Sequence, residues 1–206
     1  SLDLETAGGK LSAALSACDG NSVLIDTTGF DTDVAVCLAT GLCLARYSFK
    51  KYKTEKTSKN KNTLKVKIIV DDLKTAKSQF SDLDAMINGV SLARDLVNEP
   101  PNVLYPESYA KTIKDELKPL GVKVTIFDDK KLTKMGMGGI MAVGKASERL
   151  PRLVVMEWSG AKKKSQKPLG FVGKGVTFDT GGISLKPGAG MDLMKMDMGG
   201  SAAVVG

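Results

Sequence analysis

Two adjacent prolines, Pro100 and Pro101, impose a break near the middle of the chain. Proline removes a backbone donor and disfavours helical geometry in the residue before it. Upstream of the pair, from Lys77 to Asn98, apolar residues recur at steps of three and four, which predicts a long helix that ends at the prolines. A helix of roughly 20 residues spans about 30 Å, a length that suits a connector, so we expect a domain boundary here.

Patterns on both sides of this connector alternate between strand and helix. Before it, residues 22–26 and 64–70 are predicted strands around a helix over residues 31–47, which is a β–α–β arrangement. After it, a helix is predicted over residues 105–117. Further strands are predicted over residues 122–127, 152–158 and 168–173. The expected fold class is therefore α/β, a mixed sheet flanked by helices, in two domains joined by the long helix.

The two ends of the sequence indicate a piece of a longer polypeptide, with both domains incomplete. The chain begins without Met and closes on "GGSAAVVG", the first turns of an apolar helix for which we expect no partner surface. No apolar run reaches the roughly 18 to 20 residues that span a bilayer, so no membrane partner is expected. Cys18, Cys37 and Cys43 form no Cys-x-x-Cys pair, and we expect small buried side chains in a reducing compartment.

A formal net charge of +7 suggests a nucleic-acid-binding surface as one alternative function. The lysines concentrate in residues 50–62 and 162–167, two polar segments between apolar runs. Aromatic residues make up only 5% of the chain, which leaves few platforms for base stacking. We therefore expect solvated loops, and nucleic acid is disfavoured as a partner.

The segment 171–200, "FVGKGVTFDTGGISLKPGAGMDLMKMDMGG", gathers charged residues among glycines. Lys174, Asp179, Lys186 and Asp197 are separated by five, seven and eleven residues, a spacing with neither helical nor strand period. A phosphate-binding loop is excluded, because Gly175 follows the lysine where a hydroxyl should stand.

A divalent metal centre explains these residue types better. Aspartates supply hard oxygen ligands, and a carboxylate can bridge two ions. A lysine can coordinate a metal only as the neutral amine, which costs roughly 4 to 5 kcal/mol at pH 7 for an ordinary lysine. Desolvation and nearby dications are the effects that could offset this cost.

The segment 171–200 closely resembles the signature of the leucyl aminopeptidases, the two-metal cytosol aminopeptidases, with the same spacing. Residues 91–110 look like that family's junction between domains, and residues 136–147 resemble its next Gly-rich stretch. The resemblance implies that the chain has three parts. Residues 1–76 are the later part of an amino-terminal α/β domain, residues 77–98 are a connecting helix, and residues 99–206 are the first part of a metallopeptidase catalytic domain.

The resemblance also implies a role for each site residue. Lys174, Asp179 and Asp197 correspond to metal ligands, Asp179 bridges the two ions, and Asp197 also lies beside the substrate's amino group. Lys186 corresponds to the catalytic lysine that binds and polarises the scissile carbonyl. Met194 corresponds to a residue that lines the pocket for the first side chain of the substrate.

The expected activity is metal-dependent release of an amino-terminal, preferably apolar, residue from peptides. The family further implies two divalent ions (zinc or manganese, with magnesium or cobalt as alternatives), a bicarbonate, a homohexamer and a cytoplasmic location. Its remaining ligands come from a downstream "NTDAEGR" segment that this sequence lacks, so we expect the fragment alone to be inactive.

Two departures from the family pattern stand out. Thr180 occupies a position where Ser is more usual, and Ser201 one where Ala is common; neither is expected to touch a metal ligand.

Asp192 lies in the same acidic and basic cluster but matches no ligand of the family. Besides the nucleic-acid surface, a catalytically silent structural paralogue with the same fold stays open as an alternative.

Overall fold

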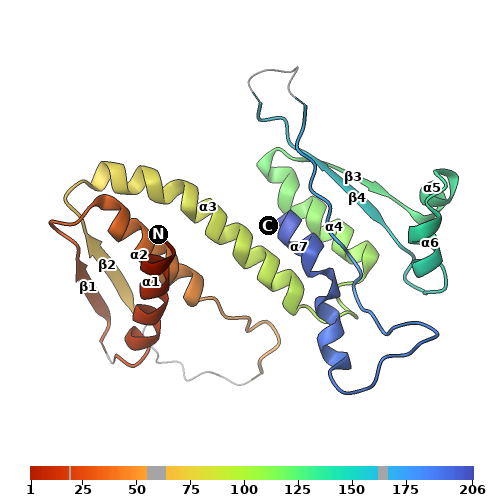
Figure 1. The fold of residues 1–206 in the computed structure, drawn as a ribbon, viewed down its shortest axis with the longest axis horizontal. Coiled ribbons are helices and arrows are strands. Elements are labelled where there is room, and N and C mark those ends of the chain that lie inside the picture. The colour runs from red at the N-terminus through yellow and green to blue at the C-terminus, as the bar shows by residue number, and fades with distance from the viewer. Residues whose placement is uncertain (19, 55–63, 162–166) are drawn as a thin grey trace. The chain divides into compact units, whose positions relative to one another are not determined.

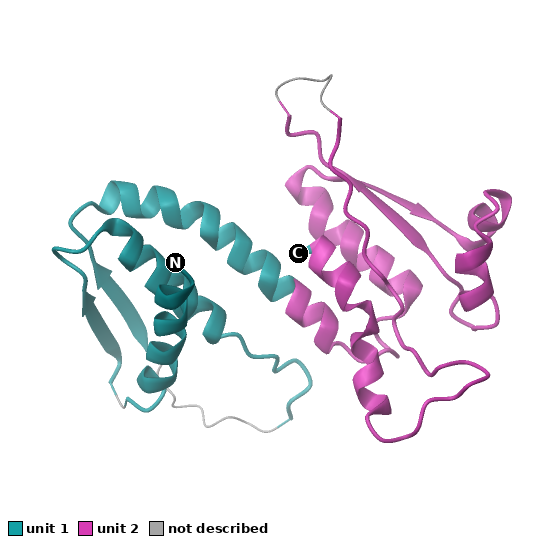
Figure 2. Cartoon of the chain, viewed as in Figure 1, with its two compact units in different colours: residues 1–92, 206 teal, residues 93–205 magenta. Residues whose placement is uncertain are grey.

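A computed structural model describes residues 1–18, 20–54, 64–161 and 167–206 (Figure 1). The chain forms two compact units, residues 1–92 with Gly206 and residues 93–205 (Figure 2). Most of the two lysine-rich segments lies outside the described residues, so their assignment as solvated loops stays a prediction. In the part of the chain that the structure describes, no helix is both long and apolar enough to cross a membrane.

The predicted β–α–β arrangement forms in the first unit. Strand β1 (Ser22–Asp26) pairs in parallel with strand β2 (Lys65–Ile69), with Ser22 opposite Lys65, and helix α2 (Thr32–Ala45) connects them. Helix α1 (Leu2–Leu15) was not predicted. Its adjacent Gly8 and Gly9 lower helix propensity by about 1 kcal/mol each relative to Ala, and packing against α2 offsets that cost.

Glycines allow α1 and α2 to cross at close range. A Cβ added to Gly8 would overlap the Leu38 carbonyl, and a Cβ added to Gly41 would overlap the Glu5 carbonyl. Both positions are buried. The backbones of the two helices are therefore in direct contact, and a side chain at either glycine would force them apart.

Gly41→Ala is expected to lower the free energy of unfolding by about 2 to 3 kcal/mol, because overpacking against a backbone cannot be relieved by a side-chain rotation. Gly9→Ala is the matched control, since its Cβ would lie 3.8 Å from the Ala45 side chain, which is ordinary contact. The control should be neutral or slightly stabilising through helix propensity. Urea unfolding of both variants measures the difference, and equal stability of the two would refute this account of the crossing.

Helix α3 (Leu73–Asn98) contains the predicted long helix and contributes residues to both units. It ends at Asn98, as the proline pair predicts, but begins four residues before Lys77. The Asp72 side chain accepts hydrogen bonds from the backbone N–H groups of Lys74 and Thr75, both at 3.0 Å, and so caps the first turn. The proposed domain limits at 76/77 and 98/99 stay a prediction.

The second unit combines helices with a small antiparallel sheet. Strand β3 (Lys123–Phe127) pairs with strand β4 (Leu153–Glu157), as their predicted ranges suggested. The α-helices are α4 (Pro106–Leu117), α5 (Asp129–Lys134), α6 (Gly138–Gly144) and α7 (Gly199–Val205), and the 3-10 helices are η1 (Lys118–Leu120) and η2 (Met191–Met198). The α/β class is thus confirmed, and the described residues contain one parallel and one antiparallel pair of strands.

The strand predicted over residues 168–173 is wrong. No other described residue forms a ladder with this segment, and a strand exists only where its backbone groups are paired. Phe171 and Val172 are accordingly exposed. Lys174, which follows this segment, is therefore not positioned by a strand, and other contacts must place it.

Two burial expectations also need correction. The final apolar helix does have a partner surface, because Met198 just before it and Ala202 within it are fully buried. Burial of an apolar face supplies most of the stability of so short a helix. The cysteines are less buried than expected, with Cys18 exposed and Cys37 and Cys43 partly buried.

Candidate functional site

Lys174 and Asp197 form an ion pair across 23 positions of the chain. The Lys174 Nζ donates to Asp197 Oδ1 at 2.8 Å and lies 2.7 Å from Oδ2. This hydrogen bond, with the negative charges of Asp197 and Asp179, raises the pKa of Lys174 above its ordinary value despite partial desolvation. Among the protein groups alone, the amine is therefore held in its charged form.

Lys186 and Asp179 form the second ion pair of the site. The Lys186 Nζ donates to Asp179 Oδ2 at 2.9 Å. This bond, followed by a 2.9 Å bond from the Gly181 N–H to Oδ1, lowers the pKa of Asp179. The carboxylate is thus charged over the whole neutral range.

A tight loop brings Lys186 back to Asp179. The Lys186 N–H donates to the Thr180 carbonyl at 2.9 Å and closes the loop. Gly181 has a φ of +97°, and a Cβ there would overlap the Ser184 carbonyl. Only glycine fits that position without strain, which gives one of the many glycines in this segment a physical role.

Met194 of helix η2 contacts the second pair. Its Sδ lies 3.1 Å from the Lys186 Nζ. We call the five predicted site residues the cluster: two ion pairs, linked by the weaker electrostatic interaction between Lys174 and Asp179, and Met194. The cluster holds two lysines and two aspartates whose formal charges cancel. Side-chain exposure falls from 58% at Lys174 to 23% at Asp197, so the site is open on the lysine side.

The chemistry of this cluster fits a divalent cation. The second oxygen of Asp197, Oδ2, is buried and accepts no hydrogen bond of good geometry from the described residues, although the Lys174 nitrogen is close to it. A buried carboxylate oxygen that accepts no well-aligned hydrogen bond can serve as a metal ligand, because buried polar atoms favour full pairing. Asp192, in contrast, is exposed in the first turn of η2 and takes no part in either ion pair.

The set of donors is nevertheless small. Within the four described ranges, no three side chains of the types His, Cys, Asp and Glu gather into a cluster that could hold a metal ion. The site offers two carboxylates and an amine, whereas divalent ions take roughly four to six ligands. Further donors would have to come from outside these ranges.

Ser201 is a residue of this site that the sequence analysis missed. Its backbone N–H donates to the Lys174 carbonyl at 2.9 Å. The expectation that Ser201 touches no predicted ligand residue is therefore wrong. The contact is made by the backbone and spans 27 positions of sequence, so neither the residue type nor the spacing predicts it.

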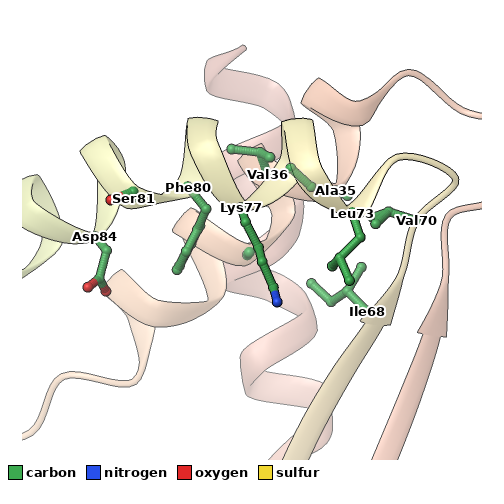
Figure 3. Close-up of a pocket in the computed structure, with 11 residues that line it drawn as sticks. Ala35, Val36, Ile68, Val70, Leu73, Lys77, Phe80, Ser81 and Asp84 are labelled. Carbon is green, nitrogen blue, oxygen red and sulfur yellow. The ribbon is translucent and has the colours of Figure 1, made fainter.

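A hollow of about 380 Å³ occurs elsewhere, in the first unit (Figure 3). Apolar side chains of α2, β2 and α3 line it, together with Lys77, Ser81 and Asp84. None of the predicted site residues contributes to it. The hollow therefore adds nothing to the chemistry of the cluster.

Comparison with known proteins gives three kinds of similarity. The family model "Cytosol aminopeptidase family, catalytic domain" matches residues 91–206. A probable cytosol aminopeptidase of Rhizobium leguminosarum bv. trifolii is 49% identical over 205 residues, covering 97% of this chain and 41% of that protein.

Two solved structures share the fold over 98% of the chain. The bottromycin maturation enzyme BotP in complex with Mn has a TM-score of 0.80 at 30% identity, with 42% of its own chain covered. A tomato leucine aminopeptidase mutant has a TM-score of 0.82 at 27% identity, with 40% of its chain covered. The present chain thus spans about two fifths of the proteins that it matches.

Proposed function

The chain belongs to the cytosol aminopeptidase family, and from this premise we propose that the protein carrying it is a metal-dependent aminopeptidase. Its substrates would be peptides, from which it releases amino-terminal residues, preferably apolar ones such as leucine. The observation that carries the proposal is the cluster of two Lys–Asp ion pairs drawn from one glycine-rich segment.

Lys174, Asp179 and Asp197 are the residues that would hold two divalent ions. When bound, such ions supply water activated for attack on a carbonyl near neutral pH. The buried Oδ2 of Asp197, which accepts no well-aligned hydrogen bond from the described residues, supports its assignment as a ligand. Lys174 would have to give up its bond to Asp197 and one proton, because only the neutral amine has a free electron pair.

Lys186 would keep its charge and donate a hydrogen bond to the carbonyl oxygen of the scissile bond. An ammonium group held in place before the reaction stabilises the negative charge that develops on this oxygen. The bond to Asp179 and the contact with Met194 Sδ hold the Lys186 amine in position. Met194 is partly exposed, and we assign its thioether to the wall of the pocket for the first side chain of the substrate.

Several finer properties belong to the same proposal. Manganese and zinc are the first metals to test, because one structural relative is described in complex with Mn. A bicarbonate near the cluster, a homohexameric assembly and a cytoplasmic location are proposed by analogy with the family. These properties concern the complete polypeptide, because the present chain spans only about two fifths of the proteins that it matches.

Hydrolysis of a leucine chromogenic amide by the complete polypeptide tests the proposed function. The protein is stripped with a chelator and assayed before and after Mn²⁺ or Zn²⁺ is restored. We expect turnover only with metal, and slower turnover when leucine is replaced by a charged residue. Metal binding without turnover of any amino-terminal amide would instead favour a silent structural paralogue.

A further inference from the structure

Ser201 contacts the chain on both sides of the Lys174–Asp197 pair. Its N–H donates to the Lys174 carbonyl at 2.9 Å, and its hydroxyl donates to the carbonyl of Met198, the residue after Asp197, at 2.8 Å. One residue is thus bonded to the backbone at Lys174 and to the backbone next to Asp197. Movement of Ser201 would therefore change the distance between the Lys174 and Asp197 side chains.

Tyr109 of helix α4 in turn holds Ser201. The Tyr109 hydroxyl lies 3.0 Å from Ser201 Oγ, and the tyrosine is only 5% exposed. The single hydroxyl proton of Ser201 is used in the bond to Met198, so the tyrosine must be the donor. Burial raises the pKa of the Tyr109 hydroxyl, which keeps this donor protonated at neutral pH.

Glycines bring the Lys174 segment into direct contact with the start of α7. A Cβ added to Gly173 would overlap Ser201 Cα and would lie 2.7 Å from the Gly200 carbonyl oxygen. The Gly175 Cβ position is 3.4 Å from Ser201 Oγ. Because no side chain intervenes, a shift of Ser201 would pass directly to the backbone that carries Lys174.

We propose that Tyr109 and Ser201 are positioning residues that fix Lys174 relative to Asp197 through the hydrogen-bond chain Tyr109–Ser201–Met198. They touch neither the reacting atoms nor a metal. Their effect is on the affinity of the site for a divalent ion. The inference rests on the proposed function for its biological meaning, but its test measures metal affinity and does not need catalysis. Outer residues that bond directly to metal-ligand side chains change affinity by about 10- to 100-fold when replaced, and a smaller effect is expected here because the bonds are made to the backbone.

The experiment compares Tyr109→Phe, Ser201→Ala and the double variant in the complete polypeptide. Tyr109→Phe keeps the buried ring and removes only the donor. Tyr105→Phe is the matched control, since its ring packs on Arg149 at 4.0 Å and stays in place. Isothermal titration with Mn²⁺ alone gives the Kd, thermal unfolding gives stability, and a leucine amide gives KM and the Mn²⁺ concentration for half-maximal activity.

Tyr109→Phe should raise the Kd for Mn²⁺ by about fivefold, the effect of one hydrogen bond of about 1 kcal/mol. Ser201→Ala removes the bonds to both Met198 and Tyr109 and should raise the Kd by at least as much. The double variant should raise it no further than Ser201→Ala, because the two residues act as one unit. The Mn²⁺ concentration for half-maximal activity should rise by the same factor with KM unchanged, and Tyr105→Phe should behave as the parent. A Kd within twofold of the parent, with only a lower melting temperature, would reduce the pair to a structural role and overturn the inference.

The two proposals fail separately. A parent protein that binds Mn²⁺ but hydrolyses no leucine amide contradicts the proposed function, while the Kd values of the variants still decide the positioning role. Normal hydrolysis by the parent, with unchanged Kd values in the variants, contradicts only the positioning role.

Discussion

Lys186→Ala in the complete polypeptide should lower kcat/KM for a leucine amide by about 100-fold or more. Removal of one donor that is held in place for a developing oxyanion typically costs 10² to 10³ in rate. Asp179 and Met194 both contact the Lys186 amine and restrict its position. The Lys186 side chain is still 36% exposed, so a substrate can reach it. The measurement is steady-state kinetics at saturating Mn²⁺.

An exposed lysine of α5 provides the control for this prediction. Lys130→Ala removes the same charge outside the cluster and should leave kcat/KM within twofold of the parent. Binding of Mn²⁺ should persist in Lys186→Ala, since the lysine is not assigned as a ligand. Turnover within tenfold of the parent in that variant would mean that Lys186 does not stabilise the transition state.

Asp197→Asn should raise the Kd for Mn²⁺ by at least about 100-fold. The amide keeps the size of the side chain but removes the negative charge, and changes outside the ligand shell alone already cost 10- to 100-fold. It also deprives Lys174 of its nearest anion, since both carboxylate oxygens lie within 2.8 Å of that amine. Titration calorimetry with Mn²⁺ measures the loss directly, without any dependence on substrate.

Asp192→Asn is the matched control, because this exposed aspartate lies on the same helix η2 and removes the same charge. It should change the Kd for Mn²⁺ by less than threefold. Equal effects of the two substitutions would show that the net charge of the segment governs metal affinity, and Asp197 would lose its assignment as a ligand.

Local sequence patterns predicted most of the elements that carry their own signal. Exposed and half-buried side chains alternate along strands β1 and β2, and apolar residues recur every three or four positions in helices α2 and α4. Pro100 determines where α3 ends. Helix α1 escaped because Gly8 and Gly9 weaken its propensity, and its stability comes from a crossing with α2 that no local window contains. The strand predicted at residues 168–173 failed for the opposite reason, since an apolar run without a paired neighbour gives no strand.

The candidate site was likewise only partly predictable from the sequence. The resemblance of segment 171–200 to the family signature singled out Lys174, Asp179, Lys186 and Asp197, and the structure joins them into two ion pairs. Which lysine pairs with which aspartate could not be predicted, because it depends on the loop closed by the Lys186 N–H and on the placement of η2. The bond between Tyr109 and Ser201 joins residues 92 positions apart, and only the packing of α4 against α7 reveals it.

Anomalous diffraction from crystals of the complete polypeptide soaked in Mn²⁺ tests the central claim most directly. Our account predicts anomalous peaks in contact with the Lys174 Nζ and the carboxylates of Asp179 and Asp197, and the loss of the 2.8 Å hydrogen bond between Lys174 and Asp197. Ordered metal elsewhere, or no anomalous density beside that nitrogen while the bond to Asp197 persists, would contradict it.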